Sequence, residues 1–102
     1  MTLIERVLHE VAPVAAEATP VEVIIGAYWT LTTISHRGTL YGGLSSTLGG
    51  GDEHHHGGGH AVRQAGHLLE LPVTALADLA RSANPLEASV GMATLNALLA
   101  VT

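Results

Sequence analysis

The sequence predicts an α+β fold with an N-terminal helix, a three-stranded antiparallel meander and then C-terminal helices. Three observations carry this prediction. Apolar residues recur at helical spacing in the first eleven positions, the pattern changes to alternation from Val21, and a long apolar run with a clear helix start follows Asn84. With 102 residues, the chain is long enough for one domain with one hydrophobic core.

The N-terminal helix is predicted from its cap and its apolar face. Thr2 and Glu5 have the spacing of a capping box, and one face then collects Leu3, Ile4, Val7, Leu8 and Val11. We expect the helix to end near Pro13, which has no amide hydrogen to donate. A continuation over residues 15–18 beyond a kink stays open, and Ala18-Thr19-Pro20 is expected to turn the chain.

Three strands are predicted between residues 21 and 47. Val21, Val23 and Ile25 alternate with their neighbours, and residues 28–34 are rich in β-branched and aromatic side chains. His36-Arg37-Gly38 is typical of a turn, after which a third strand runs from Thr39 toward Thr47. The Gly42-Gly43 pair in that strand indicates a bulge or a close approach by another backbone.

The C-terminal third is predicted to be helical. Residues 61–71 are ambiguous between a short helix and irregular chain, and residues 74–81 form a short helix with Leu76, Leu79 and Ala80 inward. Asn84-Pro85-Leu86-Glu87 is a strong helix start, and this helix should run to about Ala100. Its small residues allow close packing on the sheet; they are Ala88, Gly91, Ala93 and Ala97.

The composition indicates an aliphatic core and a covered surface. Apolar residues make up 47%, charged residues 13%, and Phe is absent, so we expect Leu, Val, Ile and Ala to pack around Trp29, Tyr28 and Tyr41. Low charge and an apolar final helix suggest a partner, and a homodimer is expected. A net charge of −5, with four Arg and no Lys, disfavours nucleic-acid binding.

The sequence contains no Cys, no signal-peptide pattern and no membrane-spanning run, and these absences indicate its redox chemistry and its location. With no Cys, there is no disulfide, thiolate ligand or thiol nucleophile. The N-terminus shows no signal-peptide pattern, and residues 86–101 are too short to span a bilayer, which needs roughly 20 residues. We therefore expect a cytoplasmic protein that does not enter membranes.

A metal site is predicted in the glycine- and histidine-rich segment 49–60. Neutral imidazole is a common ligand for transition metals and carboxylates can complete the shell, so the candidate ligands are Asp52, Glu53, His54, His55, His56 and His60. The alternative is a solvated low-complexity linker that binds metal only as a purification tag does. His67 is an outlying candidate, whereas His9 and His36 are expected to be solvated.

The chemistry of this ligand set suits Ni, Zn, Cu or Co without selecting among them. Closing a flexible loop of about 18 residues costs roughly 2 to 3 kcal/mol, and a metal at about 100 times its dissociation constant returns roughly 2.7 kcal/mol. The free energy of metal binding is therefore large enough to offset the cost of ordering the segment. A general base at Asp52 or Glu53 beside a metal-bound water would make an enzyme, but the spacing does not require one, and we expect no catalysis.

Several segments together resemble a known family. They are Ile25–Thr30, Gly43–Thr47, Ala77–Ala80, Asn84–Ala88 and Gly91–Leu99. In this order they are similar to the first domain of the heavy-metal chelation proteins, which implies an enolase N-terminal-like fold of unknown function by itself. In two-domain members a Rossmann-like domain follows, whereas this chain stops at Thr102, so we expect a single domain over residues 1–102 without that second domain.

Two functions of different class follow from these observations. The first is a small metal-binding protein that uses the histidine-rich segment. The alternative is a non-catalytic dimerisation or lid module that docks on a separate Rossmann-like partner through the apolar last helix or the sheet.

Overall fold

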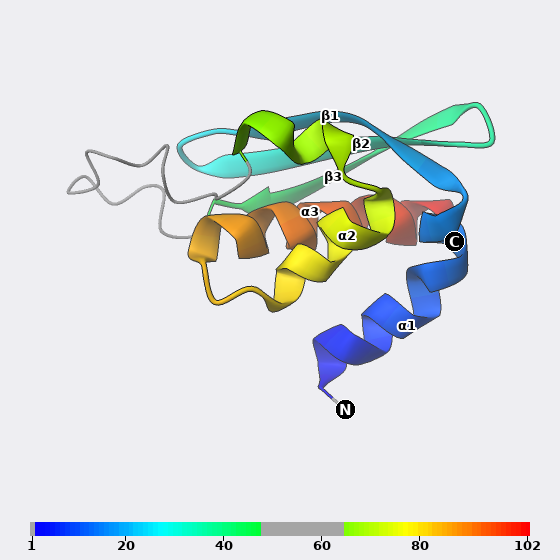
Figure 1. Ribbon diagram of the computed structural model, residues 1–102, viewed down its shortest axis with the longest axis horizontal. Helices are drawn as coiled ribbons and strands as arrows, with labels where there is room; N and C mark the ends of the chain where they lie inside the picture. Colours follow the sequence, from blue (N-terminus) through cyan, green and yellow to red (C-terminus); the bar gives the residue numbers. More distant parts are fainter. Residues whose placement is uncertain (1, 48–64) are drawn as a thin grey trace.

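The computed structural model describes residues 2–47 and 65–102. Its elements follow the order α1 (Leu3–Ala16), β1 (Ala18–Ile25), β2 (Trp29–His36), β3 (Thr39–Ser46), η2 (Ala65–Glu70), α2 (Val73–Asp78), η3 (Leu79–Arg81) and α3 (Pro85–Val101). Figure 1 shows the sheet as one layer, with α3 running beneath it, α2 in front of α3 and α1 below them. The predicted α+β class and element order are confirmed.

The sheet is an antiparallel meander in the order β1-β2-β3. Arg37 and Gly38, both at positive φ, form the two-residue turn between β2 and β3. Positive φ at both central residues is the conformation whose twist matches a tight hairpin. The pairing of β1 with β2 is interrupted by a bulge between Pro20 and Glu22.

Two boundaries differ from the sequence predictions. Helix α1 continues through Pro13 to Ala16. Pro13 lies on the exposed side, where water can satisfy the backbone carbonyl that loses its partner, while Val11 and Ala15 are buried on the other side. Strand β1 begins at Ala18 and not at Val21, and Pro20 is tolerated there because β1 is an edge strand.

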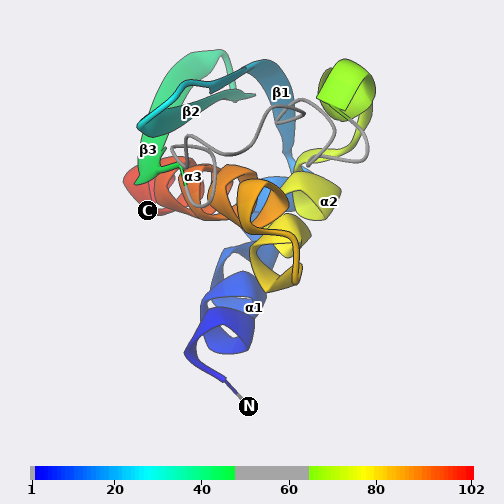
Figure 2. The same ribbon diagram turned by 90° about the vertical axis from the view of Figure 1, so that its left-hand side faces the viewer.

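Helix α3 is the centre of the molecule. It packs on β2 and β3 on one side and on α1, α2 and η3 on the other, so most of its apolar residues are buried. Figure 2 shows it enclosed between the sheet and the other helices. Its apolar character therefore reflects burial of most of its length in the core, while Leu99 near its C-terminal end is 45% exposed.

The core lies on both sides of α3. One cluster joins α1, α2 and α3 to Ile34 of β2, and the second places Leu68 of η2 against α2 and α3 beside β1. The expectation that Trp29 and Tyr28 lie in this core is wrong. Trp29 is 63% exposed on the outward side of the sheet, and Tyr28 is 74% exposed in the connection between β1 and β2.

Candidate functional site

The predicted metal ligands lie outside the described residues. Segment 48–64 contains all six, namely Asp52, Glu53, His54, His55, His56 and His60. The first described range ends at Thr47, and the second begins at Ala65, the first residue of η2. The metal site is therefore a prediction that rests on the sequence.

Thr47 is held firmly at the end of β3. Its amide donates to the carbonyl of Tyr28 at 2.9 Å, and its hydroxyl shares a hydrogen bond of 2.8 Å with the hydroxyl of Thr30. On the return side, Leu68 anchors η2 because its side chain is buried against the second core cluster. Thr47 before the segment and Leu68 beyond it thus both make packed contacts with the rest of the fold.

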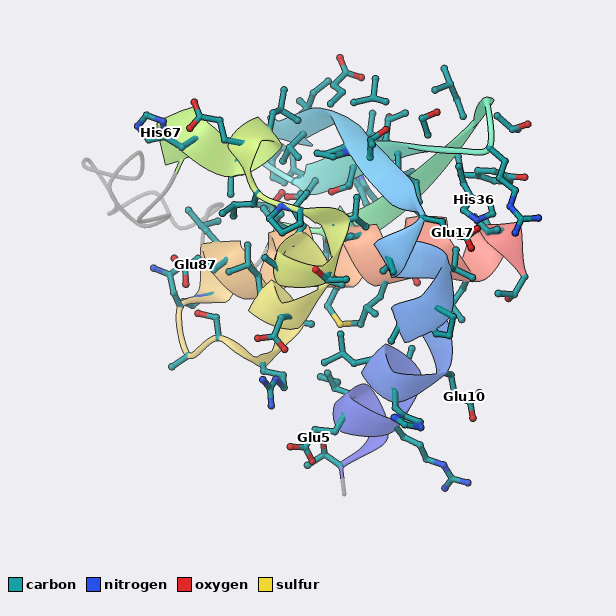
Figure 3. The ribbon with its side chains drawn as sticks, turned by 45° about the vertical axis from the view of Figure 1, so that its right-hand side comes forward. Glu5, Glu10, Glu17, His36, His67 and Glu87 are labelled. Atoms are coloured by element: carbon teal, nitrogen blue, oxygen red, sulfur yellow. The ribbon has the colours of Figure 1, made fainter. Side chains whose placement is uncertain are left out.

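A buried carboxyl group lies at the N-terminal end of α3. Glu87 is 3% exposed, and the hydroxyl of Ser82 donates to its Oε1 at 2.6 Å. Asn84 caps the same helix end, where its Oδ1 accepts from the amides of Leu86 and Glu87. The helix dipole stabilises a carboxylate at this position. Figure 3 shows Glu87 in the first turn of α3. From the sequence, this residue was recognised only as part of a helix start.

His67 lies on η2 beside Glu70. Its Nδ1 is 3.4 Å from Oε2 of Glu70, and both side chains are more than 70% exposed. A carboxylate next to an imidazole is a common pair around metal ligands, because the carboxylate orients the ring. Two groups alone do not make a site, so His67 stays an outlying candidate.

His36 is less solvated than expected. It ends β2, and its side chain is only 11% exposed. Its Nε2 lies 3.5 Å from Oε1 of Glu17, the oxygen that also accepts from Arg37. Figure 3 shows His36 and Glu17 facing each other where α1 leads into β1. This cluster ties the hairpin turn to the end of α1, which accounts for the burial of His36. His9, by contrast, is exposed as expected.

A shallow depression lies between α1 and η3, with a volume of about 440 Å³ and Arg81 in its wall. The guanidinium bonds Asp78 at 2.8 Å and lies 3.7 Å from a carboxylate oxygen of Glu5. The hydrogen bond with Asp78 raises the pKa of Arg81 above its ordinary value. Since two carboxylates already neutralise this cation, the depression offers little attraction to an anion.

Ser45 has a structural role in the described chain. The hydroxyl of Ser45 donates to the carbonyl of Ser89 at 2.6 Å, as expected of a structural hydroxyl. Residues 2–47 and 65–102 contain no cluster of three or more His, Asp or Glu side chains placed to hold a metal ion. In the same ranges, no helix has both the length and the apolar character needed to cross a membrane.

The fold and these contacts define a small α+β domain with a three-stranded sheet backed by helices. Residues 6–99 match the family DUF4213, whose description is "Putative heavy-metal chelation", and the chain belongs to that family. The resemblance proposed from the sequence is thereby confirmed. No curated protein gives a significant match.

The fold is shared with a solved structure of a larger protein. This is a protein of unknown function from the DUF364 family of Pyrococcus horikoshii, with a TM-score of 0.69 and 22% sequence identity. The similarity covers 95% of the present chain and 36% of that protein. The chain thus spans about a third of the length of this relative, and at this identity the likeness concerns the fold alone.

Proposed function

We propose that this protein binds a divalent transition metal ion through the histidine-rich segment 52–60. His54, His55, His56 and His60 supply the imidazole ligands, and Asp52 and Glu53 complete the shell. The observation that carries the proposal is the coincidence of this ligand-rich segment with membership in a family described by heavy-metal chelation. Ni, Zn, Cu and Co all suit this ligand set.

The ligands that the rest of the chain provides also support this assignment. There is no Cys to form a thiolate site, and no cluster of three suitable ligands occurs in residues 2–47 and 65–102. A metal held by this chain alone therefore needs ligands from the segment between Thr47 and Ala65. Thr47, which precedes the segment, is hydrogen-bonded to Thr30 of β2, and Leu68, three residues after Ala65, is buried in the core.

Calorimetry on the untagged protein tests the proposal. Titration with Ni, Zn, Cu and Co should show binding by the native chain, and a variant with His54, His55, His56 and His60 changed to Ala should lose at least about 100-fold in affinity, roughly 2.7 kcal/mol. The matched control changes His9 and His67 to Ala, which alters two exposed histidines and leaves the segment intact. Equal binding by the native chain and the four-histidine variant would remove the proposal.

A second candidate function is a non-catalytic dimerisation or lid module. The chain spans 36% of the solved relative, which has room for another domain. A non-catalytic lid module that docks on a separate Rossmann-like protein fits this relation. Co-purification with a protein of that fold, identified by mass spectrometry, is the expected result, and a chain that binds no purified candidate of that class contradicts it.

A further inference from the structure

The outward face of the sheet carries an apolar surface away from α3. On β2, the odd-numbered positions point outward, because Thr30, Thr32 and Ile34 on the even positions are fully buried against the helices. Strand pairing sets Ile24, Leu31 and Leu44 side by side in one row across the three strands. Trp29 precedes Leu31 by two residues and so lies on the same face. We define Ile24, Trp29, Leu31 and Leu44 as the outward patch.

We propose that two copies of this chain associate face to face through the outward patch. The proposal is independent of metal binding. It names the surface and the partner, which are the outward side of the sheet and a second copy of the same surface.

The size of the surface suits this partner. Trp29 is 63% exposed, Leu44 55% and Ile24 48%, and Leu40, further along β3 on the same face, is 63% exposed. With roughly 150 Å² from the indole and roughly 100 Å² from each aliphatic side chain, this face offers on the order of 500 Å² of apolar surface. Polar neighbours on the same face, Ser46 beside Trp29 and Thr33 between the outward patch and Leu40, bring the area toward the roughly 800 Å² per partner of a stable interface.

The charge of the face selects an uncharged partner. The protein carries a net charge of −5, so two copies repel each other at most orientations. On the outward face, however, Glu22 is the one charged side chain among the described positions of the three strands. A basic partner would find few carboxylates here, whereas two copies stacked on this face bring one strand carboxylate each, Glu22, toward the contact.

Both sheet edges are obstructed, which favours stacking over strand addition. On β3, Asn96 of α3 donates its side-chain amide to the carbonyl of Leu44 at 2.7 Å, so this edge carbonyl already has a partner. Along β1, η2 lies beside the strand, and the bulge at Pro20 distorts it further. The surface that stays open in the described chain is the face, and two sheets can stack about 10 Å apart.

Sedimentation equilibrium and Trp29 fluorescence test the proposal on the intact chain. Trp29 is the single tryptophan, so its emission reports directly on the outward patch. We expect the mass to rise to that of a dimer with concentration, and the emission to move to shorter wavelength over the same range. Leu44→Glu should weaken the dimer at least about 30-fold, because a twofold interface contains the substitution twice.

Leu3→Glu is the matched control, because Leu3 is 77% exposed on α1, away from the sheet. This variant should dimerise like the native chain, and far-ultraviolet circular dichroism should show that both variants are folded. A native chain that stays monomeric at high concentration overturns the proposal, whether or not it binds a Rossmann-like protein. A dimer that forms without any change in Trp29 emission, or that resists Leu44→Glu, also overturns it.

Discussion

Gly42 and Gly43 are adjacent in β3, but their missing side chains face different surroundings. A Cβ atom on Gly43 would overlap the carbonyl oxygen of Ala93 and the amide nitrogen of Ala97, both in the backbone of α3. A Cβ atom on Gly42, on the outward face, would lie 3.6 Å from Cδ1 of Leu31, an ordinary contact. The close approach of another backbone that the glycine pair indicated is thus found at Gly43.

Gly43→Ala should lower the free energy of unfolding by at least about 2 kcal/mol, because α3 would have to move away from the sheet. Gly42→Ala, the matched control, should change it by less than about 0.5 kcal/mol. Urea unfolding followed by circular dichroism, at one protein concentration, measures both. Similar losses for the two variants would show that α3 does not hold this distance from β3.

Glu5 provides a pH-dependent contribution at the start of α1. Its carboxylate accepts from the backbone amide of Thr2 at 2.9 Å, while its own amide donates to the Thr2 hydroxyl at 3.1 Å. The hydrogen bond from the Thr2 backbone is the main reason that the pKa of Glu5 lies below its ordinary value of 4.5, followed by the Thr2 side chain and, more weakly, the charge of Arg81. Folding therefore favours the charged form of this carboxyl group.

Because the pKa is lowered on folding, the stabilisation by Glu5 is present above the unfolded value and is lost as pH falls through the folded one. Glu5→Gln should lower the melting temperature at about pH 7 and have little effect at about pH 3. Glu10→Gln, an exposed carboxylate on the same helix, is the control. Thermal unfolding at both pH values checks this, and a loss of equal size at both would contradict it.

At the scale of elements, the contact between α3 and the sheet contains hydroxyl groups where a larger apolar layer was expected. Thr30 and Thr32 are fully buried, and their hydroxyls lie 2.8 Å from that of Thr47 and 3.3 Å from that of Thr94. Small side chains with paired hydroxyls fit the short distance between the sheet and α3 that Gly43 permits. A tryptophan would not fit there, which explains why Trp29 lies on the other face.

The Thr30 and Thr47 pair allows a double-mutant test. Thr47→Val leaves the buried Thr30 hydroxyl without this partner and should cost about 1 to 3 kcal/mol. Changing both residues to Val should cost less than the sum of the single changes, with a coupling of about 1 kcal/mol. Urea unfolding of the four proteins in the cycle measures this, and strict additivity would mean that the two hydroxyls do not interact.

At the scale of the whole molecule, proton competition should govern metal binding. Imidazole must be neutral to bind a metal, and its ordinary pKa is about 6.5. Lowering the pH from about 7.5 to about 5.5 should therefore weaken binding about tenfold for each ligating histidine.

Calorimetry over this pH range uses a buffer that does not chelate metals. The slope of the logarithm of the affinity against pH gives the number of ligating imidazoles. A loss of about 100-fold or more would require at least two ligands from His54, His55, His56 and His60. The four-histidine variant is the control, and affinity that does not depend on pH would exclude imidazole ligands.

Much of the fold could be predicted from the sequence because its signals are local. The capping box at Thr2, the turn at Arg37-Gly38 and the helix start at Asn84 each depend on residues within a few positions of one another. Together with periodicity they determined the α+β class and the order of elements, and the similarity to the family, whose model matches residues 6–99, was visible in other short segments. The candidate metal ligands also come from local composition alone.

The tertiary structure decided which surfaces are covered. Alternation in β2 shows that two faces exist, but it does not tell which one receives α3, because that depends on contacts between distant residues such as Gly43 and Ala93. Trp29 and Leu31 would be assigned to the core by hydropathy, yet the inward position paired with Gly43, where α3 comes close, is held by the small side chain of Thr32. The same long-range packing buries most of α3 and carries α1 through Pro13, since burial of Val11 and Ala15 outweighs one lost backbone hydrogen bond.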